Sequence, residues 1–209
     1  MTLEAAPGEA RLDRRQKRWR LLHDAIYDAA CELFLEADFE TTSVDQIAER
    51  ADVARKTAFN HFPRKRDFIS EWGKRRRHQV QEALSVELLA EPSLDVVLRH
   101  YFAELAALNV NSRPLTIRML MGWREHGGPF DADPHALTDV FERFVTAAIE
   151  RGEVAEGIPP RMVATMLYSS YFGILYDWCA GTDTAPPFDL ELSFMKAVDV
   201  VIAGLKAAR

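Results

Sequence analysis

The sequence of 209 residues contains little of what marks secreted, membrane-bound or metal-dependent proteins. It has only two cysteines, Cys31 and Cys179, which lie far apart in apolar helical patterns, so we expect neither a disulfide framework nor a cysteine metal site. No apolar run approaches the roughly 18 residues that a membrane span needs, and the N-terminal segment is rich in arginine where a signal peptide would be apolar. These absences favour a soluble, cytoplasmic protein.

The sequence also lacks the motifs by which several enzyme classes are recognised. It contains neither a glycine-rich phosphate loop, nor a Gly-x-Ser-x-Gly turn, nor a His-Glu-x-x-His helix. The six histidines show no spacing that would place metal ligands together on one face of a helix. We therefore expect no catalytic residues, no metal site and no cofactor.

The charge of the chain is unevenly distributed. The formal net charge is −6, yet residues 50–78 contain ten basic residues against three acidic ones. A basic segment on an acidic protein is typical of a surface that binds a polyanion such as nucleic acid. A solvated helix face is the alternative for a run such as residues 74–77, and charge alone does not decide between them.

Apolar residues recur at helical spacing along almost the whole chain, and no stretch alternates apolar and polar residues over the length of a strand. Proline and glycine residues separate the helical patterns from one another. The pattern predicts an all-α protein. The expected helices are residues 19–37, 43–50, 54–61, 67–90, 93–109, 114–123, 135–151, 160–180 and 188–205.

The second and third of these helices form the most informative stretch. Either Thr42 with Asp45 or Ser43 with Gln46 provides a capping box at the start of the first short helix. A tight turn follows around Asp52, a residue type that tolerates the left-handed conformation. Two short helices joined by about three residues predict a helix-turn-helix, whose second helix enters the major groove of DNA.

The side chains predicted on the second helix suit this role. Arg55 or Lys56 can bond to guanine, Asn60 can bond to adenine, and Thr57 can reach a base edge or a phosphate. Lys65, at the start of the next helix, is suited to neutralise a phosphate. Short amphipathic helix pairs without any role in DNA binding are common, so this pattern alone leaves that alternative open.

Residues 19–75 resemble the DNA-binding region of the TetR family of transcriptional repressors. The matching elements are Asp38-Phe39, Thr42-Ser43-Val44, Ile47-Ala48, Ala51-x-Val53, Thr57-x-Phe59-x-His61-Phe62 and Lys65-x-x-Phe68. The resemblance implies DNA-backbone contacts from Thr42, Phe59, His61 and Lys65. It implies base contacts from Arg55, Lys56, Thr57 and Asn60. The predicted DNA-binding residues are Thr42, Ser43, Arg55, Lys56, Thr57, Phe59, Asn60, His61 and Lys65.

The chain departs from the family pattern at three positions. It has Asp52 where the family usually has Gly, Ala54 where it has Ser, and Phe59 where it has Tyr. Asp52 adds negative charge beside DNA, Ala54 forfeits a helix N-cap, and Phe59 has no hydroxyl to offer a phosphate. Asp52 and Phe59 motivate a rival hypothesis, in which the chain is a helical protein-interaction or small-molecule-binding module that has lost DNA binding.

For the second half of the chain, the resemblance implies a helical regulatory domain that encloses a small molecule, and the residues there favour an apolar or aromatic effector. Residues 93–209 are rich in aromatic residues and methionine, which can line an adaptable pocket or simply fill the core. The candidate pocket residues are Tyr101, Phe102, Met119, Trp123, Phe141, Phe144, Met166, Tyr171 and Tyr176.

The expected organisation is a flexible basic arm over 1–18, a DNA-binding domain over 19–75, and a ligand-binding and dimerisation domain over 76–209. The arm either follows a DNA minor groove or is a solvated tail. Helix 160–180 is apolar on more than one side and helix 188–205 adds further apolar residues, so one monomer would struggle to cover both, which favours a homodimer through a four-helix interface. The sequence thus predicts a ligand-responsive regulator, most simply a repressor that a small molecule releases from a palindromic operator.

Overall fold

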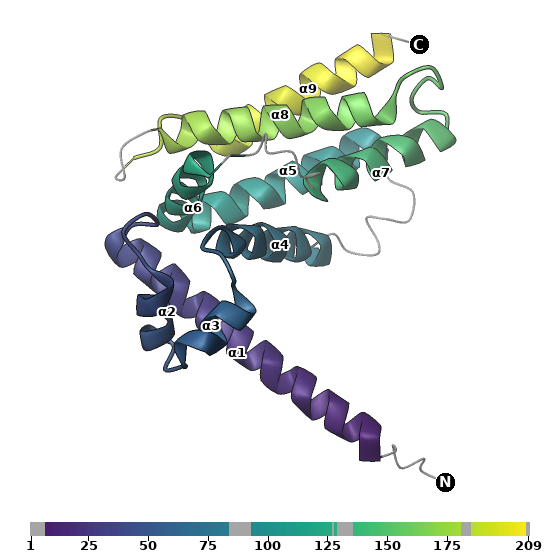
Figure 1. Cartoon of the computed structure of the whole chain (residues 1–209). Helices are drawn as coiled ribbons and strands as arrows, with labels where there is room; N and C mark the ends of the chain where they lie inside the picture. Colours follow the sequence, from purple (N-terminus) through teal and green to yellow (C-terminus); the bar gives the residue numbers. More distant parts are fainter. Residues whose placement is uncertain (1–6, 84–92, 127, 129–135, 181–184, 208–209) are drawn as a thin grey trace. The chain divides into compact units, whose positions relative to one another are not determined.

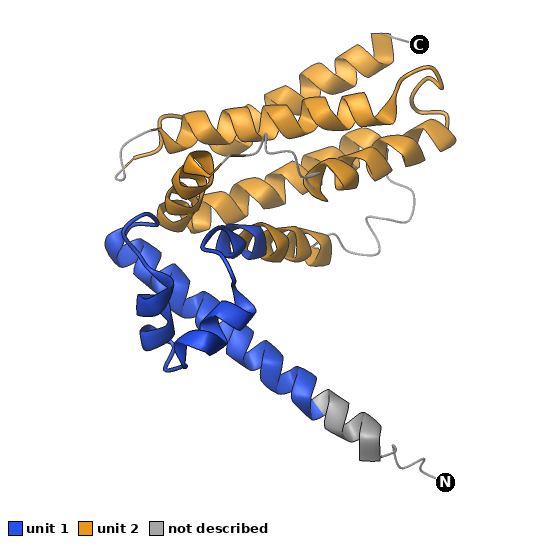
Figure 2. Ribbon diagram, viewed as in Figure 1, with its two compact units in different colours: residues 1–71 blue, residues 72–209 orange. Residues whose placement is uncertain are grey.

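The computed structural model describes residues 7–83, 93–126, 128, 136–180 and 185–207 of the chain (Figure 1). These residues form helices α1 to α9 and contain no strand, which confirms the predicted all-α fold. The chain divides into two compact units, residues 1–71 and residues 72–209 (Figure 2). The division falls inside helix α4, a few residues before the position expected from the sequence.

Unit 1 contains α1 (Pro7–Ala37), α2 (Val44–Arg50), α3 (Arg55–His61) and the first turns of α4 (Arg66–Ala83). Its core is built from large apolar side chains that α1, α2, α4, the loop before α2 and the residue directly after α3 contribute. These buried residues include Ile26, Phe34, Phe39, Ile47, Phe62 and Phe68.

The expectation that α1 starts at residue 19 is wrong, because the helix begins at Pro7. The physical reason is local: Pro7 suits the first position of a helix, and the following residues include strong helix formers such as Glu, Ala, Arg, Leu and Lys. The side chains of residues 14–20 are exposed. Helix propensity rather than packing therefore forms this part of α1.

Unit 2 contains the rest of α4 together with α5 (Leu94–Asn111), α6 (Arg113–Glu125), α7 (Ala136–Glu150), α8 (Pro160–Cys179) and α9 (Leu190–Ala207). Helix α8 packs between α7 and α9, and α5 packs against α9 (Figure 1). The expected continuation of α4 to residue 90 extends beyond Ala83 into residues 84–90, outside the described part of the chain.

Aromatic rings form the centre of unit 2. The ring of Phe102 on α5 stacks on Phe141 of α7, with centroids 5.4 Å apart, and meets Phe194 of α9 edge-on at 5.4 Å. Edge-to-face and offset aromatic pairs each contribute about 0.5–1.5 kcal/mol beyond the burial of their area. None of the described helices is both long and apolar enough to cross a membrane.

Candidate nucleic-acid interface and regulatory core

Helices α2 and α3 are joined by a short turn in which Asp52 takes the left-handed conformation, with φ of 52°. The backbone N–H of Val53 donates to the carbonyl oxygen of Ala48 across the turn, at 3.0 Å. The capping box of α2 uses Ser43 and Gln46, the second of the two pairs expected from the sequence. Local capping and one left-handed residue thus set the helix-turn-helix.

Helix α3 turns one side toward the core of unit 1 and the other toward solvent. Ala58 is fully buried, and Phe62, directly after the helix, is also buried. Arg55, Lys56 and Asn60 are exposed, while Thr57 is partly exposed. The residue types expected to read base edges therefore lie on the accessible side of this helix.

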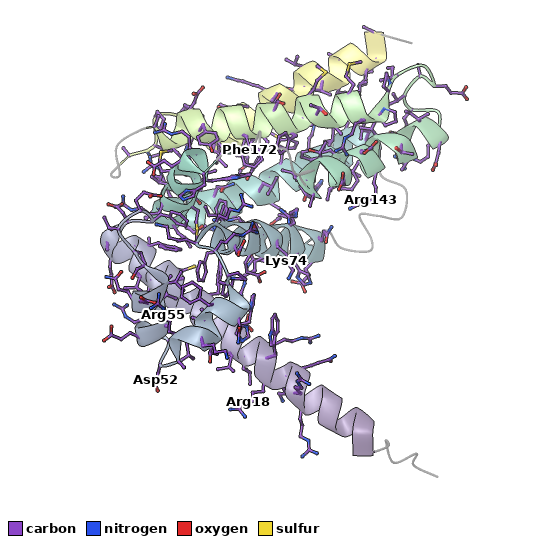
Figure 3. The ribbon with its side chains drawn as sticks, viewed as in Figure 1. Arg18, Asp52, Arg55, Lys74, Arg143 and Phe172 are labelled. Atoms are coloured by element: carbon purple, nitrogen blue, oxygen red, sulfur yellow. The ribbon has the colours of Figure 1, made fainter. Side chains whose placement is uncertain are left out.

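Arg55 is held in place from both sides. Its Nε atom lies 2.7 Å from Oδ1 of Asp45 on α2, and its guanidinium lies over the ring of Phe59 at 5.4 Å. Both members of the ion pair are mostly exposed, so the pair adds little to stability. Figure 3 shows Arg55 at the helix-turn-helix, with Asp52 in the turn below it.

Several cations of unit 1 are engaged by neighbouring oxygens. Arg50 pairs with Glu32 and Glu36 of α1, and Arg64 pairs with Asp67 at the start of α4. In contrast, the described residues offer Lys56 no hydrogen-bond or ion-pair partner. The ammonium of Lys56 is therefore available to bind an external anion.

The residues expected at the DNA backbone fall into different environments. Phe59 is exposed, as is Ser43, which was predicted to bind DNA without a stated contact. Lys65 is anchored: its ammonium donates to the carbonyl oxygen of Glu40 at 2.9 Å and lies over the ring of Phe39 at 4.7 Å. Thr42 is only 3% exposed, and its hydroxyl donates to the carbonyl oxygen of Asp38 at 2.7 Å. This side chain holds the turn after α1, and its contact with DNA stays a prediction.

His61, the last residue of α3, belongs to a group that sequence reasoning missed. Its Nδ1 atom lies 3.4 Å from Nδ1 of His23, and its ring stacks on Trp19 at 4.8 Å. Nε2 of His23 lies 3.6 Å from Oε1 of Glu71. Burial, together with the neighbouring His23, lowers the pKa of His61 below its ordinary value. We call Trp19, His23, His61 and Glu71 the histidine cluster.

In unit 2 the structure brings most candidate pocket residues into the interior. Tyr101, Phe102, Phe141 and Tyr171 are buried with Met119, and Phe144 lies edge-on to Tyr101 at 5.6 Å. Trp123 and Tyr176 are partly exposed. Met166 lies apart from this group, because more than half of its side chain is exposed on the outer face of α8.

A buried polar network, which the sequence did not suggest, crosses unit 2. Arg76 of α4 is 7% exposed and donates to the side-chain oxygens of Asn109, Ser112 and Thr116. Nδ2 of Asn109 in turn donates to the hydroxyl of Tyr171 at 3.1 Å. The network joins α4, α5, α6 and α8. Its one sequence signal was the spacing of Arg76, one turn after Trp72 and one turn before Val80 on the buried stripe of α4.

Comparison with known proteins points to one family. Residues 26–71 match the model of bacterial regulatory proteins of the tetR family. The transcriptional regulator TcmR of Streptomyces glaucescens is 42% identical over 53 residues, which cover 25% of this chain and 24% of that protein.

Two further relatives extend over nearly the whole chain. The fatty acid metabolism regulator protein of Bacillus subtilis is 21% identical over 195 residues, covering 91% of this chain and 98% of the relative. The crystal structure of Thermus thermophilus FadR, a TetR-family repressor in complex with lauroyl-CoA, has a TM-score of 0.70 and 25% identity, covering 88% of this chain and 94% of that one. The chain thus matches the TetR family of transcriptional regulators over residues 26–71, and over most of its length it resembles regulators of that family.

Proposed function

We propose that this ligand-responsive transcriptional repressor binds a palindromic operator as a homodimer and leaves it when a fatty acyl ligand occupies unit 2. The observation that carries the proposal is the two-sided character of α3. This helix buries Ala58 and exposes Arg55, Lys56 and Asn60. A helix held on its inner side and carrying guanine-type and adenine-type readers on its outer side suits the major groove.

The homodimer is supported by apolar side chains on the outside of the last two helices. Met162 and Met166 on α8, and Leu192 and Val200 on α9, are each more than half exposed. Helices α8 and α9 pack side by side within the chain, and each adds two of these exposed apolar side chains to the surface of unit 2. A second copy covers this surface in a two-fold four-helix interface, and two-fold symmetry matches an operator with two inverted half-sites.

The fatty acyl ligand is the finer part of the proposal. It is supported by the near full-length relative that regulates fatty acid metabolism and by the related repressor bound to lauroyl-CoA. The interior of unit 2 also suits contact with an acyl chain, because its buried side chains are apolar and rich in aromatic rings, with Met119 among them. This narrows the expected small apolar or aromatic effector to an amphipathic acyl compound.

We also propose that the basic N-terminal part of α1 contributes to DNA binding. Arg14, Arg15, Lys17, Arg18 and Arg20 are exposed on this part of the helix. Cations that neutralise phosphates strengthen DNA binding without regard to sequence, and this contribution weakens as salt rises.

The test is a gel shift with DNA from upstream of the protein's own gene, followed by titration with lauroyl-CoA. We expect salt-sensitive binding by a dimer, and release as lauroyl-CoA saturates the protein. Ligand and operator must weaken each other by the same factor, since the coupling free energy is reciprocal. Lys56→Ala should weaken operator binding, and Arg124→Ala, on an exposed residue of α6, serves as its control. Absence of salt-sensitive binding to any palindrome would favour the module that has lost DNA binding.

A further inference from the structure

The hydroxyl of Tyr101 stands out in the interior of unit 2. Tyr101 lies on α5 with 0% of its surface exposed, and its hydroxyl has no hydrogen-bond partner within the described part of the chain. Buried hydroxyl groups are normally satisfied, because losing water without gaining a partner costs free energy. A group left in this state is a candidate donor to a molecule that binds there.

Arg77 of α4 is the second such group. It is half-buried, and no carboxylate or other oxygen of the described residues pairs with it. Its neighbour Arg76 differs, because three side-chain oxygens accept from that guanidinium. An arginine stays charged at all ordinary pH values, so Arg77 places positive charge inside unit 2 without a compensating anion among these residues.

Arg77 and Tyr101 interact electrostatically with each other. Burial lowers the pKa of Arg77, and electrostatic interaction with the side chains of Tyr101 and Tyr171 opposes this change by raising it. Burial raises the pKa of Tyr101, and the charges of Arg77 and of Arg143, an exposed residue of α7, oppose that rise. Cations and tyrosine hydroxyls from α4, α5, α7 and α8 thus interact electrostatically within unit 2. Hydrogen bonds link three of these helices, because Arg76, the neighbour of Arg77, donates to Asn109 of α5, which donates to the hydroxyl of Tyr171.

The rest of the surroundings are aromatic. The ring of Tyr101 meets Phe141 and Phe144 edge-on, with centroids 5.6 Å away in both cases. Phe144 and Arg77 are partly exposed, so solvent reaches the surroundings of Tyr101 from these side chains. A ligand that suits this place carries an oxyanion at one end and an apolar body at the other.

We propose that Arg77 and Tyr101 bind the anionic head of the effector, a carboxylate or phosphate group, while its acyl chain lies among the aromatic side chains of unit 2. This inference rests on the proposed acyl effector and deepens it by assigning the residues that hold the head. The guanidinium supplies charge and the hydroxyl supplies a hydrogen bond. Because Arg77 belongs to α4, the helix that begins in unit 1, the anion acts directly on that helix.

The experiment measures the Kd of three probes for the full-length protein by calorimetry: laurate, lauroyl-CoA and dodecanol. The variants are Tyr101→Phe and Arg77→Gln, with Tyr27→Phe and Lys74→Gln as matched controls. Each test variant should weaken the binding of an anionic probe about tenfold or more, as expected for a hydrogen bond to a charged group. Tyr101→Phe should fold as well as the wild type, since the removed hydroxyl has no partner.

The pattern across probes identifies the head group. Weaker binding of laurate supports a carboxylate in this place, whereas weaker binding of lauroyl-CoA alone supports a phosphate. Unchanged affinities would overturn the inference, and so would an equal loss for dodecanol, which would indicate apolar packing.

The operator separates this inference from the proposed function. If lauroyl-CoA still releases DNA from both variants at the wild-type concentration, the anion site is wrong and the repressor function stands. If the wild-type protein binds none of the three probes, the acyl effector itself is wrong, and the site proposed for its head is wrong with it.

Discussion

The Nδ1 atoms of His23 and His61 lie 3.4 Å apart and join α1 to the end of the recognition helix α3. Trp19 stacks on both rings, and Glu71 lies beside the far side of His23. Two imidazoles at this distance share a proton readily, but they repel when both are protonated. The end of α3 is therefore sensitive to protonation.

This arrangement predicts how stability depends on pH. In the unfolded chain His61 titrates near its ordinary pKa of about 6.5, whereas the folded pKa is lower. Below pH 6.5 the unfolded state binds more protons, so the free energy of unfolding falls as the pH falls toward the folded pKa. Above that range His61 adds no pH dependence.

The measurement is thermal unfolding between pH 7.5 and 5.0. His61→Phe should show a smaller loss of Tm on acidification than the wild type. The control His100→Gln, at an exposed position of α5, should retain the full loss. Identical pH profiles for His61→Phe and the wild type would contradict this account.

The buried network around Arg76 predicts a large loss of stability when its centre is removed. Arg76→Met deprives Asn109, Ser112 and Thr116 of a donor, at about 1–3 kcal/mol for each group left unsatisfied. Urea unfolding measures the effect, with Lys74→Met on the exposed side of the same helix as the control. A loss no greater than that of the control would mean that the network does not stabilise unit 2.

The uncapped start of α3 predicts a stabilising substitution. Ala54 occupies the N-cap with extended backbone angles, φ −61° and ψ 141°, and makes no side-chain cap bond. Ala54→Ser should therefore raise the free energy of unfolding by about 0.5–2 kcal/mol, which urea unfolding can detect. The same substitution at Ala207, the last residue of α9, should have no such effect.

The turn residue Asp52 allows backbone and charge effects to be separated. Asp52→Asn removes the charge but keeps a residue that tolerates positive φ, whereas Asp52→Gly also relieves the strain. Both variants should bind operator DNA more tightly, and the gain should shrink as salt rises. Only Asp52→Gly should also raise Tm. A gain in affinity confined to the glycine variant would show that charge is not the cause.

The basic part of α1 gives a prediction about salt. Deletion of residues 1–17 should make the dependence of log K on log salt shallower, by about 0.9 for each DNA phosphate that this segment neutralises in the wild type. Operator titrations at several salt concentrations provide the slopes. An unchanged slope would show that this part of the helix does not touch DNA.

The helix-turn-helix could be predicted because its signals are local. The capping box at Ser43 and the left-handed residue Asp52 each depend on neighbours within a few positions. The apolar spacing that buries Ala58 is equally short-range. Patterns among residues that lie so close in sequence predict the local backbone conformation directly.

The polar clusters could not be predicted in the same way. His23 and Glu71 meet His61 only because α1 and α4 pack beside α3, and no periodicity encodes that meeting. Arg76 sits in the basic run 74–77, for which the sequence left a polyanion-binding surface and a solvated helix face open, although Arg76 lies on the buried stripe of α4. The early start of α1 was missed because propensity alone forms a helix there, without an apolar face to signal it.

The central claim is that the outer side of α3 reads bases, and one measurement tests it most directly. Operators selected from random DNA are titrated with the wild type and with Asn60→Ala, varying one base pair at a time. We predict that Asn60→Ala loses about 1–3 kcal/mol of discrimination at one adenine in each half-site and keeps its preferences elsewhere. Unaltered preferences at every position of the operator would contradict the claim.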